Sequence, residues 1–305
     1  MGKSKQLNLT QYKLYWLLAG LLAFLLSSCA ASRPYDVPED TGLLWKIERA
    51  NNPTSYLLGT IHSDDPRVLD IPEQVIQALD HVDQFVMEVL IDSDAEKAAG
   101  LAMYYRDGTT LESVIGKPLY RKVVKAMRAK GIEAGLVYMM KPWGALTILN
   151  MPEARSNKFL DVVLLEEAKK RGKELRQLET IQEQIAVFDE MDIKLQIDLL
   201  TDTVNNLEFI KQLMEETINV YLSNDLEAIS HLNDRYLGFT SKQAAKAYDQ
   251  RLLVDRNTRM LERLLPMIRK QSTLIAVGAL HLPGEKGLIP TLREEGFTLT
   301  PIKFD

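Results

Sequence analysis

Segments with the pattern of β-strands lie near the two ends of this chain, and a long stretch with helical patterning separates them. Alternating residues in Leu43–Arg49 and Ser55–Ile61 flank the turn-forming Asn51-Asn52-Pro53-Thr54, which predicts a hairpin. Four further short runs are expected to add strands, at 84–89, 174–178, 273–277 and 297–302. Because the segments are distant in sequence, they predict one α/β core with a mostly parallel central sheet and the helical stretch packed over it.

The helical stretch, over about residues 94–270, is expected to be a large insertion within a single domain of residues 42–305. Residues 180–222, which are rich in Gln, Glu and Leu, predict two long helices. One further amphipathic helix is predicted over 246–270. The sequence contains no internal repeat and no low-complexity tract, so it gives no reason to separate the insertion as an independent domain.

The N-terminal residues have the parts of an export signal. Residues 1–13 are positively charged, and residues 14–26 form an apolar run that is too short to span a bilayer comfortably. The string Leu26-Ser27-Ser28-Cys29 resembles a lipobox, in which the cysteine becomes acylated and forms the new N-terminus. We therefore predict that residues 1–28 are a lipoprotein signal peptide.

Cys29 is the only cysteine in the chain, so no disulfide can form within one molecule. A lipid such as palmitate on this cysteine explains why an exported chain keeps a single thiol. Residues 29–41 contain two prolines and no apolar pattern, and they are expected to be a spacer. The pattern predicts a lipid anchor in the membrane of a bacterial cell envelope, with the domain outside the cytoplasm. A plain cleavable signal and an uncleaved membrane anchor are the alternatives.

The charge of the chain bears on its partners. The net charge is −5, and it becomes −8 once the three lysines of the signal peptide are removed with it. An acidic chain with no basic block is a poor candidate for binding a phosphate backbone. We therefore expect no nucleic-acid partner.

Four polar residues come at, or shortly after, the ends of predicted strands: His62, Glu88, Glu179 and His281. In an open α/β sheet, the loops at the carboxyl ends of the strands converge on one crevice, where ligands bind. Gly59-Thr60-Ile61-His62 and Gly278-Ala279-Leu280-His281 also share a local pattern, a histidine three residues after a glycine. Because the chain has only four histidines, this repetition indicates one site that both segments form.

Two imidazoles with one or two carboxylates are a common ligand set for a divalent metal that keeps one position open for water. The same residues also suit acid–base chemistry without a metal. In a third interpretation, each histidine only satisfies backbone groups in its loop. Both histidines are expected to lie on loops and not within the core.

Five motifs follow one another along the chain: GTIH at 59–62, Glu88 in VMEVL at 86–90, LDVVLLEEAKKRGKELRQLET at 160–180, Arg256-Asn257 in VDRNTRM at 254–260, and GALHLPGEKGL at 278–288. In this order they resemble the motifs of the TraB/GumN family, which is related to the TIKI-type metallopeptidases. The resemblance covers nearly all of the chain after the spacer. It implies the family's fold, and for some members it implies a peptidase that requires Mn²⁺ or Co²⁺-type ions.

The leading hypothesis is a metal-dependent, peptidase-like hydrolase. His62, Glu88 and His281 would hold the metal, and Zn²⁺, Mn²⁺ or Co²⁺ would each suit these nitrogen and oxygen donors. Glu179 would be a second carboxylate ligand or the general base, and Arg256 would stabilise developing charge. The alternative hypothesis is a lipoprotein without catalytic activity that binds a peptide or another small ligand between the sheet and the helices.

The remaining polar candidates have mainly structural interpretations. Asn257 falls inside a predicted apolar helix stripe and Arg256 falls at its margin, so both need partners. Arg256 would either orient a site carboxylate or substrate oxyanion, or tie the helices to the sheet through a buried hydrogen bond. Asp64-Asp65 would either add a ligand or cap the next helix, and capping is expected. His81 and His231 are expected on the surface.

Overall fold

The computed structural model describes residues 42–90, 92–151, 158–237 and 241–304. Within these residues, six strands form one sheet in the order β4-β3-β5-β2-β1-β6. Their bounds are β1 (Leu44–Glu48), β2 (Ser55–Thr60), β3 (Gln84–Met87), β4 (Glu174–Gln177), β5 (Thr273–Gly278) and β6 (Thr298–Ile302). Each strand lies where the sequence predicts one, and the α/β fold is confirmed.

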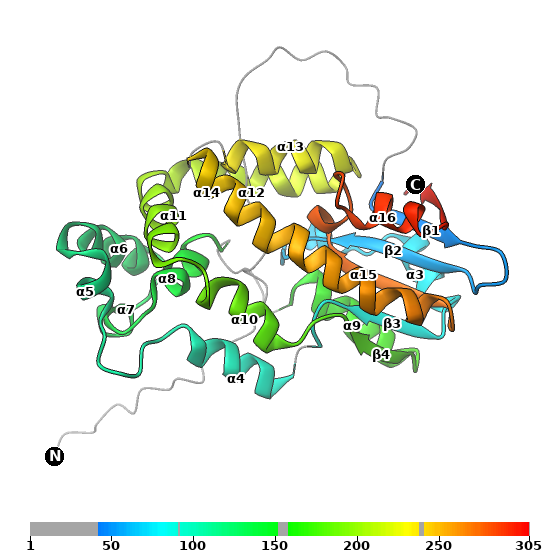
Figure 1. Ribbon diagram of the computed structural model, residues 1–305, viewed down its shortest axis with the longest axis horizontal. Coiled ribbons are helices and arrows are strands. Elements are labelled where there is room, and N and C mark those ends of the chain that lie inside the picture. Colours follow the sequence, from blue (N-terminus) through cyan, green and yellow to red (C-terminus); the bar gives the residue numbers. More distant parts are fainter. Residues whose placement is uncertain (1–41, 91, 152–157, 238–240, 305) are drawn as a thin grey trace, which may run out of the picture.

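The sheet is mostly parallel, as predicted. β4, β3, β5 and β2 run parallel to one another, and β1 is antiparallel to both of its neighbours, β2 and β6. β3 and β5 are buried along their whole length, which is typical of parallel strands that helices cover on both faces. The carboxyl ends of the four parallel strands meet at the edge of the sheet that faces the helical part of the molecule (Figure 1).

One hydrophobic core surrounds the sheet, a second lies within the helical part, and a small third one contains Leu213 and Leu232. The helices that contribute to the first are α2 (Pro66–Leu69), α3 (Glu73–Asp80), α9 (Leu160–Lys170), α12 (Leu207–Leu222), α13 (Leu226–Leu237), α15 (Asp255–Ile268) and α16 (Leu288–Glu294). Those that build the second are α4 (Ser93–Ala102), α5 (Leu111–Ile115), α6 (Lys117–Ala129), α7 (Ala134–Tyr138), α8 (Pro142–Leu149), α10 (Ile181–Asp189) and α11 (Ile193–Asn205). Figure 1 shows the sheet and the α5–α8 group at opposite ends of the long axis.

The helical stretch differs from the prediction in detail. β4 lies within it, where the sequence predicts the strand at 174–178, and separates two groups of helices. Residues 180–222 form three helices rather than two, because the Asp192 side chain accepts the N–H groups of Lys194 and Leu195 and starts a new helix there. The single helix predicted over 246–270 is α14 (Lys242–Asp249), a π-helical turn η2 (Gln250–Val254) and α15.

The predicted signal peptide at 1–28, the spacer at 29–41 and the lipidation of Cys29 fall outside the described residues. In the part of the chain that the structure describes, no helix combines the length and the apolar character needed to cross a membrane. The first described residues are fixed against the sheet, because the Trp45 indole donates to the Gly42 carbonyl at 2.7 Å. Any tether therefore joins the domain beside β1.

Candidate functional site

The two Gly-x-x-His segments follow neighbouring strands. β2 and β5 are paired in parallel with their ends in register. Beyond the sheet edge, β2 leads to the loop that carries His62, and β5 leads to the short 3₁₀ helix η3 (Ala279–His281). Gly59 permits this closeness, because a Cβ there would lie 3.1 Å from the Cα of Ala279. A side chain at Gly59 would push the two segments apart.

His62 is held by a carboxylate from α9. Its Nδ1 lies 2.7 Å from Oδ2 of Asp161, whose other oxygen accepts a hydrogen bond from the Thr60 hydroxyl at 2.9 Å. Burial lowers the pKa of His62, but the adjacent Asp161 carboxylate outweighs burial and holds the pKa above its ordinary value of 6.5. The pairing fixes Nδ1 and leaves Nε2 for a ligand or a proton.

His281 is held in the same way by a neutral partner. Its Nδ1 lies 2.5 Å from Oδ1 of Asn257 on α15. The Asn257 amide nitrogen donates to the carbonyls of Lys286 and His281, so its oxygen is the acceptor and the proton lies on Nδ1 of His281. Nε2 is buried and has no hydrogen-bond partner among the described residues. Burial and the nearby Arg256 guanidinium lower the pKa of His281 to about 3.

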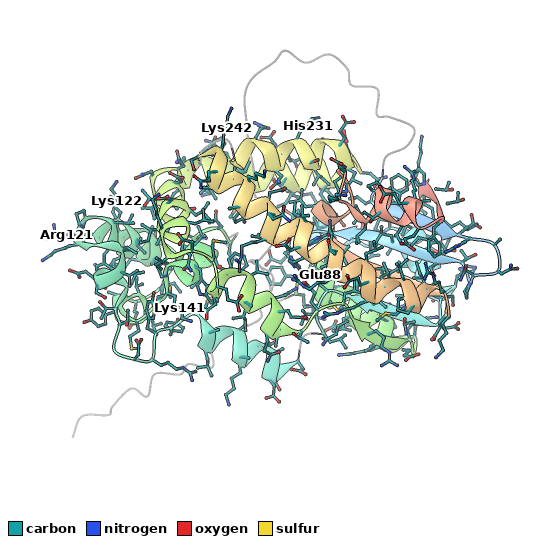
Figure 2. All side chains as sticks on the ribbon, in the orientation of Figure 1. Glu88, Arg121, Lys122, Lys141, His231 and Lys242 are labelled. Atoms are coloured by element: carbon teal, nitrogen blue, oxygen red, sulfur yellow. The ribbon has the colours of Figure 1, made fainter. Side chains whose placement is uncertain are left out.

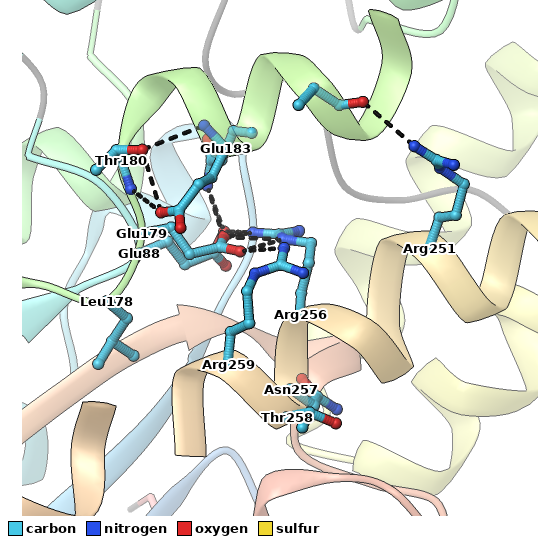
Figure 3. A network of polar contacts seen from close by, with 12 residues as sticks. Glu88, Leu178, Glu179, Thr180, Glu183, Arg251, Arg256, Asn257, Thr258 and Arg259 are labelled. Atoms are coloured by element: carbon cyan, nitrogen blue, oxygen red, sulfur yellow. Dashed lines mark hydrogen bonds and ion pairs between the residues drawn. The ribbon is translucent and has the colours of Figure 1, made fainter. Parts of the chain in front are cut away.

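Glu88 and Glu179 follow β3 and β4 and share the guanidinium of Arg256 (Figure 3). Arg256 donates to Glu88 at 2.5 Å and to Glu179 at 2.6 Å, with a further bond from its Nε to Glu179 at 2.9 Å. The Gln184 amide donates to both carboxylates. All three charged side chains are buried, so each charge depends on the others for its stability.

Glu88 connects this ion-pair cluster to the histidines. Its Oε1 accepts the backbone N–H of Gly278 at 2.7 Å and lies 3.8 Å from Nε2 of His281. Burial raises the pKa of Glu88, but Arg256 and the two histidines outweigh it and lower the pKa to about 2. Across the ordinary pH range the site therefore combines an ionised Glu88 with a neutral His281.

Arg256 and Asn257 reach this edge from the first turn of α15, directly after the π-helical turn η2. Such turns widen a helix locally and are frequent at functional sites. Both side chains face inward, with Arg256 only 2% exposed, so Arg256 lies inside the apolar stripe and not at its margin. The buried tie between helices and sheet is present, and a role of Arg256 toward a substrate stays a prediction.

A family model matches residues 43–301, the span that contains every residue of the candidate site. It is the model of the TraB/PrgY/gumN family. The chain belongs to this family. The match extends over both the sheet and the helical part, so both groups of helices belong to the family's domain.

Curated relatives include two zebrafish proteins. Metalloprotease TIKI1 of Danio rerio is 26% identical over 323 residues, which cover 89% of this chain and 65% of the relative. Metalloprotease TIKI2 of Danio rerio is 25% identical and is covered over 63% of its length. "Uncharacterized protein YbaP" of Shigella flexneri is 27% identical over 255 residues, which cover 81% of this chain and 90% of that protein. The chain spans less than two thirds of the TIKI relatives, and no solved structure matches it.

The expectation that both histidines lie outside the core is wrong for His281. Its side chain is fully buried in η3, and its neighbours Ala279 and Leu282 belong to the core around the sheet. η3 folds back beneath α15, where Asn257 binds both the ring and the backbone carbonyl of His281. His62 is different, because its side chain is 16% exposed.

Three residues contact the site that sequence reasoning did not place there: Asp161, Gln184 and Arg259. Asp161 is a buried acid in the first turn of α9, on the side of Leu160 and Leu164, and this position was the available signal. Arg259 lies one turn after Arg256 and donates to Glu179 at 3.2 Å. Nothing in the local sequence singles out Gln184.

The other polar candidates have the structural roles expected of them. Asp65 accepts the backbone N–H of Arg67 and caps α2. His81 and His231 are exposed, and His231 lies 3.5 Å from Glu227 on its own helix. None of these contacts involves a residue of the candidate site.

The chemistry of the donor set fits a divalent cation. It comprises two imidazole Nε2 atoms and an ionised carboxylate, and the buried Nε2 of His281 lacks the partner that a cation would supply. In the conformation described, Arg256 occupies one oxygen of Glu88. Within the described ranges, no three His, Cys, Asp or Glu side chains are grouped closely enough to hold an ion. The donors are adjacent but are not arranged as a coordination shell.

Proposed function

We propose that this chain is a peptidase-like hydrolase that uses a divalent cation at the carboxyl edge of its sheet. The observation that carries the proposal is the shared arrangement of the two imidazoles. Each has Nδ1 bound to a side-chain oxygen, which leaves Nε2 as the atom available for ligation. The relatives named metalloproteases support the same assignment.

His62, His281 and Glu88 would hold the cation, and Zn²⁺, Mn²⁺ or Co²⁺ would each suit them. The cation would supply Lewis acidity toward the carbonyl of the bond to be cleaved. Asp161 and Asn257 orient the imidazoles and fix their tautomers, as outer hydrogen-bond partners do in metal sites. Because His62 must lose its Nε2 proton to ligate, affinity for the cation should fall as the pH falls.

Glu179 remains our candidate for the general base or a further ligand. Its oxygens accept hydrogen bonds from Arg256, Arg259 and Gln184, so it can take a proton only if part of this pairing is released. The same contacts hold the Arg256 guanidinium in place. Arg256 can stabilise negative charge developing on the substrate only if part of this pairing is released.

The test uses the purified full-length chain after removal of bound metals. Wild-type protein should bind Zn²⁺, Mn²⁺ or Co²⁺ by calorimetry and should cleave members of a peptide library, as read by mass spectrometry. His62→Ala and His281→Ala should lose both properties. His231→Ala is the matched control, because His231 is exposed on α13, and it should retain both.

Glu179→Gln separates the roles of that residue. If Glu179 is the base, the variant should keep the ion and lose turnover. A wild-type protein that binds no divalent ion and cleaves nothing, yet captures a peptide tightly, would instead be the ligand-binding lipoprotein of the alternative hypothesis.

We also propose that the domain is tethered to a membrane of the bacterial cell envelope through a lipid on Cys29. The support is the charged, apolar and lipobox-like order of residues 1–29. Cys29→Ser should release the protein from the membrane fraction or stall its processing. Mass spectrometry that finds an unmodified Cys29 in the processed protein would contradict the tether.

A further inference from the structure

The acidic net charge of the chain conceals one strongly basic helix. Residues 117–130, which comprise α6 and the residue that follows it, contain six lysines and arginines and no aspartate or glutamate. The expectation that the chain has no basic block is therefore wrong at this position. The block is not visible in the net charge because acidic residues elsewhere in the chain outnumber it.

Four of these cations lie on one face of α6, which we call the basic face. They are Lys117, Arg121, Lys125 and Arg128, at spacings of four, four and three residues that align them along the helix. All four are exposed, while the opposite face of α6 is buried in the second core. Figure 2 shows the labelled Arg121 at the outer end of the helical part, pointing away from the molecule.

Folding does not account for this pattern. Within the described parts of the chain, none of the four cations of the basic face pairs with a carboxylate, whereas the nearby Lys141 binds Asp189 at 2.5 Å. Like charges at i and i+4 destabilise a helix, and Lys117 in the first turn opposes the helix dipole. The arrangement costs stability in the isolated domain, which points to an external anion.

Exposed apolar side chains occur on two other helices of the second core, α4 and α7. Tyr138 and Met139 at the end of α7 are 49% and 47% exposed, and Leu101 in α4 is 45% exposed. α7 packs against α6, and the backbone N–H of Tyr105, which follows α4, donates to the Met139 carbonyl at 2.8 Å. Cations combined with exposed aromatic and apolar groups suit the boundary between lipid headgroups and acyl chains.

We propose that the basic face binds an anionic phospholipid surface, with the exposed apolar residues of α4 and α7 as additional contacts. A basic patch adds an electrostatic attraction to anionic lipids, separate from the anchoring that a lipid on Cys29 would provide. Each cation near such a surface strengthens binding by about fivefold. β1, where a tether would join, and α6 lie at opposite ends of the long axis (Figure 1), so contact at both ends would lay the domain along the membrane.

The proposal is independent of hydrolase activity and is tested by lysine footprinting. Full-length protein is reconstituted into vesicles of phosphatidylcholine alone or of phosphatidylcholine with phosphatidylglycerol, and amine-labelling rates are read by mass spectrometry. Labelling of Lys117 and Lys125 should fall several-fold in the anionic vesicles only. At about 1 M salt, where the Debye length is about 3 Å, labelling should recover. Lys242, which is exposed on α14 (Figure 2), should label equally throughout.

The double variant R121E/R128E tests the charge directly. Both side chains are exposed, and a glutamate at 121 would pair with Lys117 and Lys125, so the variant should fold, as circular dichroism can verify. It should lose the protection of Lys125 in anionic vesicles, while the control K242E/K246E keeps it. The proposal is overturned by equal labelling in both vesicle types or by protection that survives the charge reversal. It is also overturned by protection without lipid, which would indicate contact between copies of this chain.

Discussion

The two histidine segments share a local pattern and follow neighbouring strands, yet they create opposite environments. His62 reaches the surface and pairs with the charged Asp161, whereas His281 is fully buried and pairs with the neutral Asn257. The carboxylate raises the pKa of His62, while burial near Arg256 lowers the pKa of His281. The Gly-x-x-His pattern thus determines where an imidazole lies, and the helix packed against it determines its charge.

Among the substitutions considered, removal of Arg256 should cause the largest loss of stability and should also reduce the difference in pKa between the two histidines. Arg256→Met leaves the buried carboxylates of Glu88 and Glu179 without their cation, which should cost about 3–5 kcal/mol of unfolding free energy in urea titrations. Because Arg256 also lowers the pKa of His281, that pKa should rise toward the pKa of His62. A variant as stable as the wild type would contradict the ion-pair cluster described here.

Truncation of the two histidines should have unequal costs. His281→Ala leaves Oδ1 of Asn257 buried without its donor, at about 1–3 kcal/mol, and adds a cavity. His62→Ala opens onto solvent, so water can take over the hydrogen bond to Asp161, and we expect a loss of about 1 kcal/mol or less. Urea unfolding of both variants, with His231→Ala as control, measures the difference. Equal losses of unfolding free energy in the two variants would contradict the conclusion that His281 is buried and His62 is partly exposed.

The pH dependence of stability should distinguish the two histidines by sign. His281 has a pKa of about 3 when folded and 6.5 ordinarily, so the unfolded chain binds more protons between these values. Stability therefore falls as the pH falls below 6.5, with a slope that approaches about 1.4 kcal/mol per pH unit. His62 has a raised folded pKa, so its contribution is complete below 6.5 and is lost as the pH rises through the folded pKa.

Urea unfolding between about pH 5 and pH 8 checks this, since imidazoles titrate there. Replacement of His281 by Gln should flatten the decline on the acidic side, and replacement of His62 by Gln should flatten the decline on the basic side. Profiles that change in the same direction would show that the two pKa shifts do not differ in sign.

The smallest effects are expected when the side chains that bind the two imidazoles, Asp161 and Asn257, are each replaced by the other residue type. Asp161→Asn should lower the pKa of His62, because a neutral amide no longer stabilises the imidazolium, and Asn257→Asp should raise the pKa of His281. Ring resonances followed by nuclear magnetic resonance in metal-free protein report both values. A His62 pKa that is unchanged in Asp161→Asn would mean that the carboxylate is not the cause of its shift.

Much of the fold follows from local sequence signals. The two strands around Asn51-Asn52-Pro53-Thr54 and the strand at 273–277 could be predicted, because each has a local sequence pattern typical of strands. The helix break at Asp192 could not be predicted, because the helical pattern of polar and apolar residues continues across it. Only the hydrogen bonds of the Asp192 side chain to the backbone mark the start of the new helix.

The site was less accessible to sequence reasoning. His62, Glu88, Glu179 and His281 converge because parallel strands end at one edge, and that part could be anticipated. Which side chain binds each imidazole depends on how α9 and α15 pack against the sheet, so Asp161 could not be assigned. The burial of His281 likewise depends on η3 folding beneath α15, which no local pattern encodes.

Diffraction from crystals of the protein grown with Zn²⁺ tests the central claim most directly. We expect one anomalous peak at the carboxyl edge of the sheet, about 2 Å from the Nε2 atoms of both His62 and His281 and bound by an oxygen of Glu88. A peak that touches only one imidazole, or no peak at this edge, would contradict the claim that the two Gly-x-x-His segments form a single cation site.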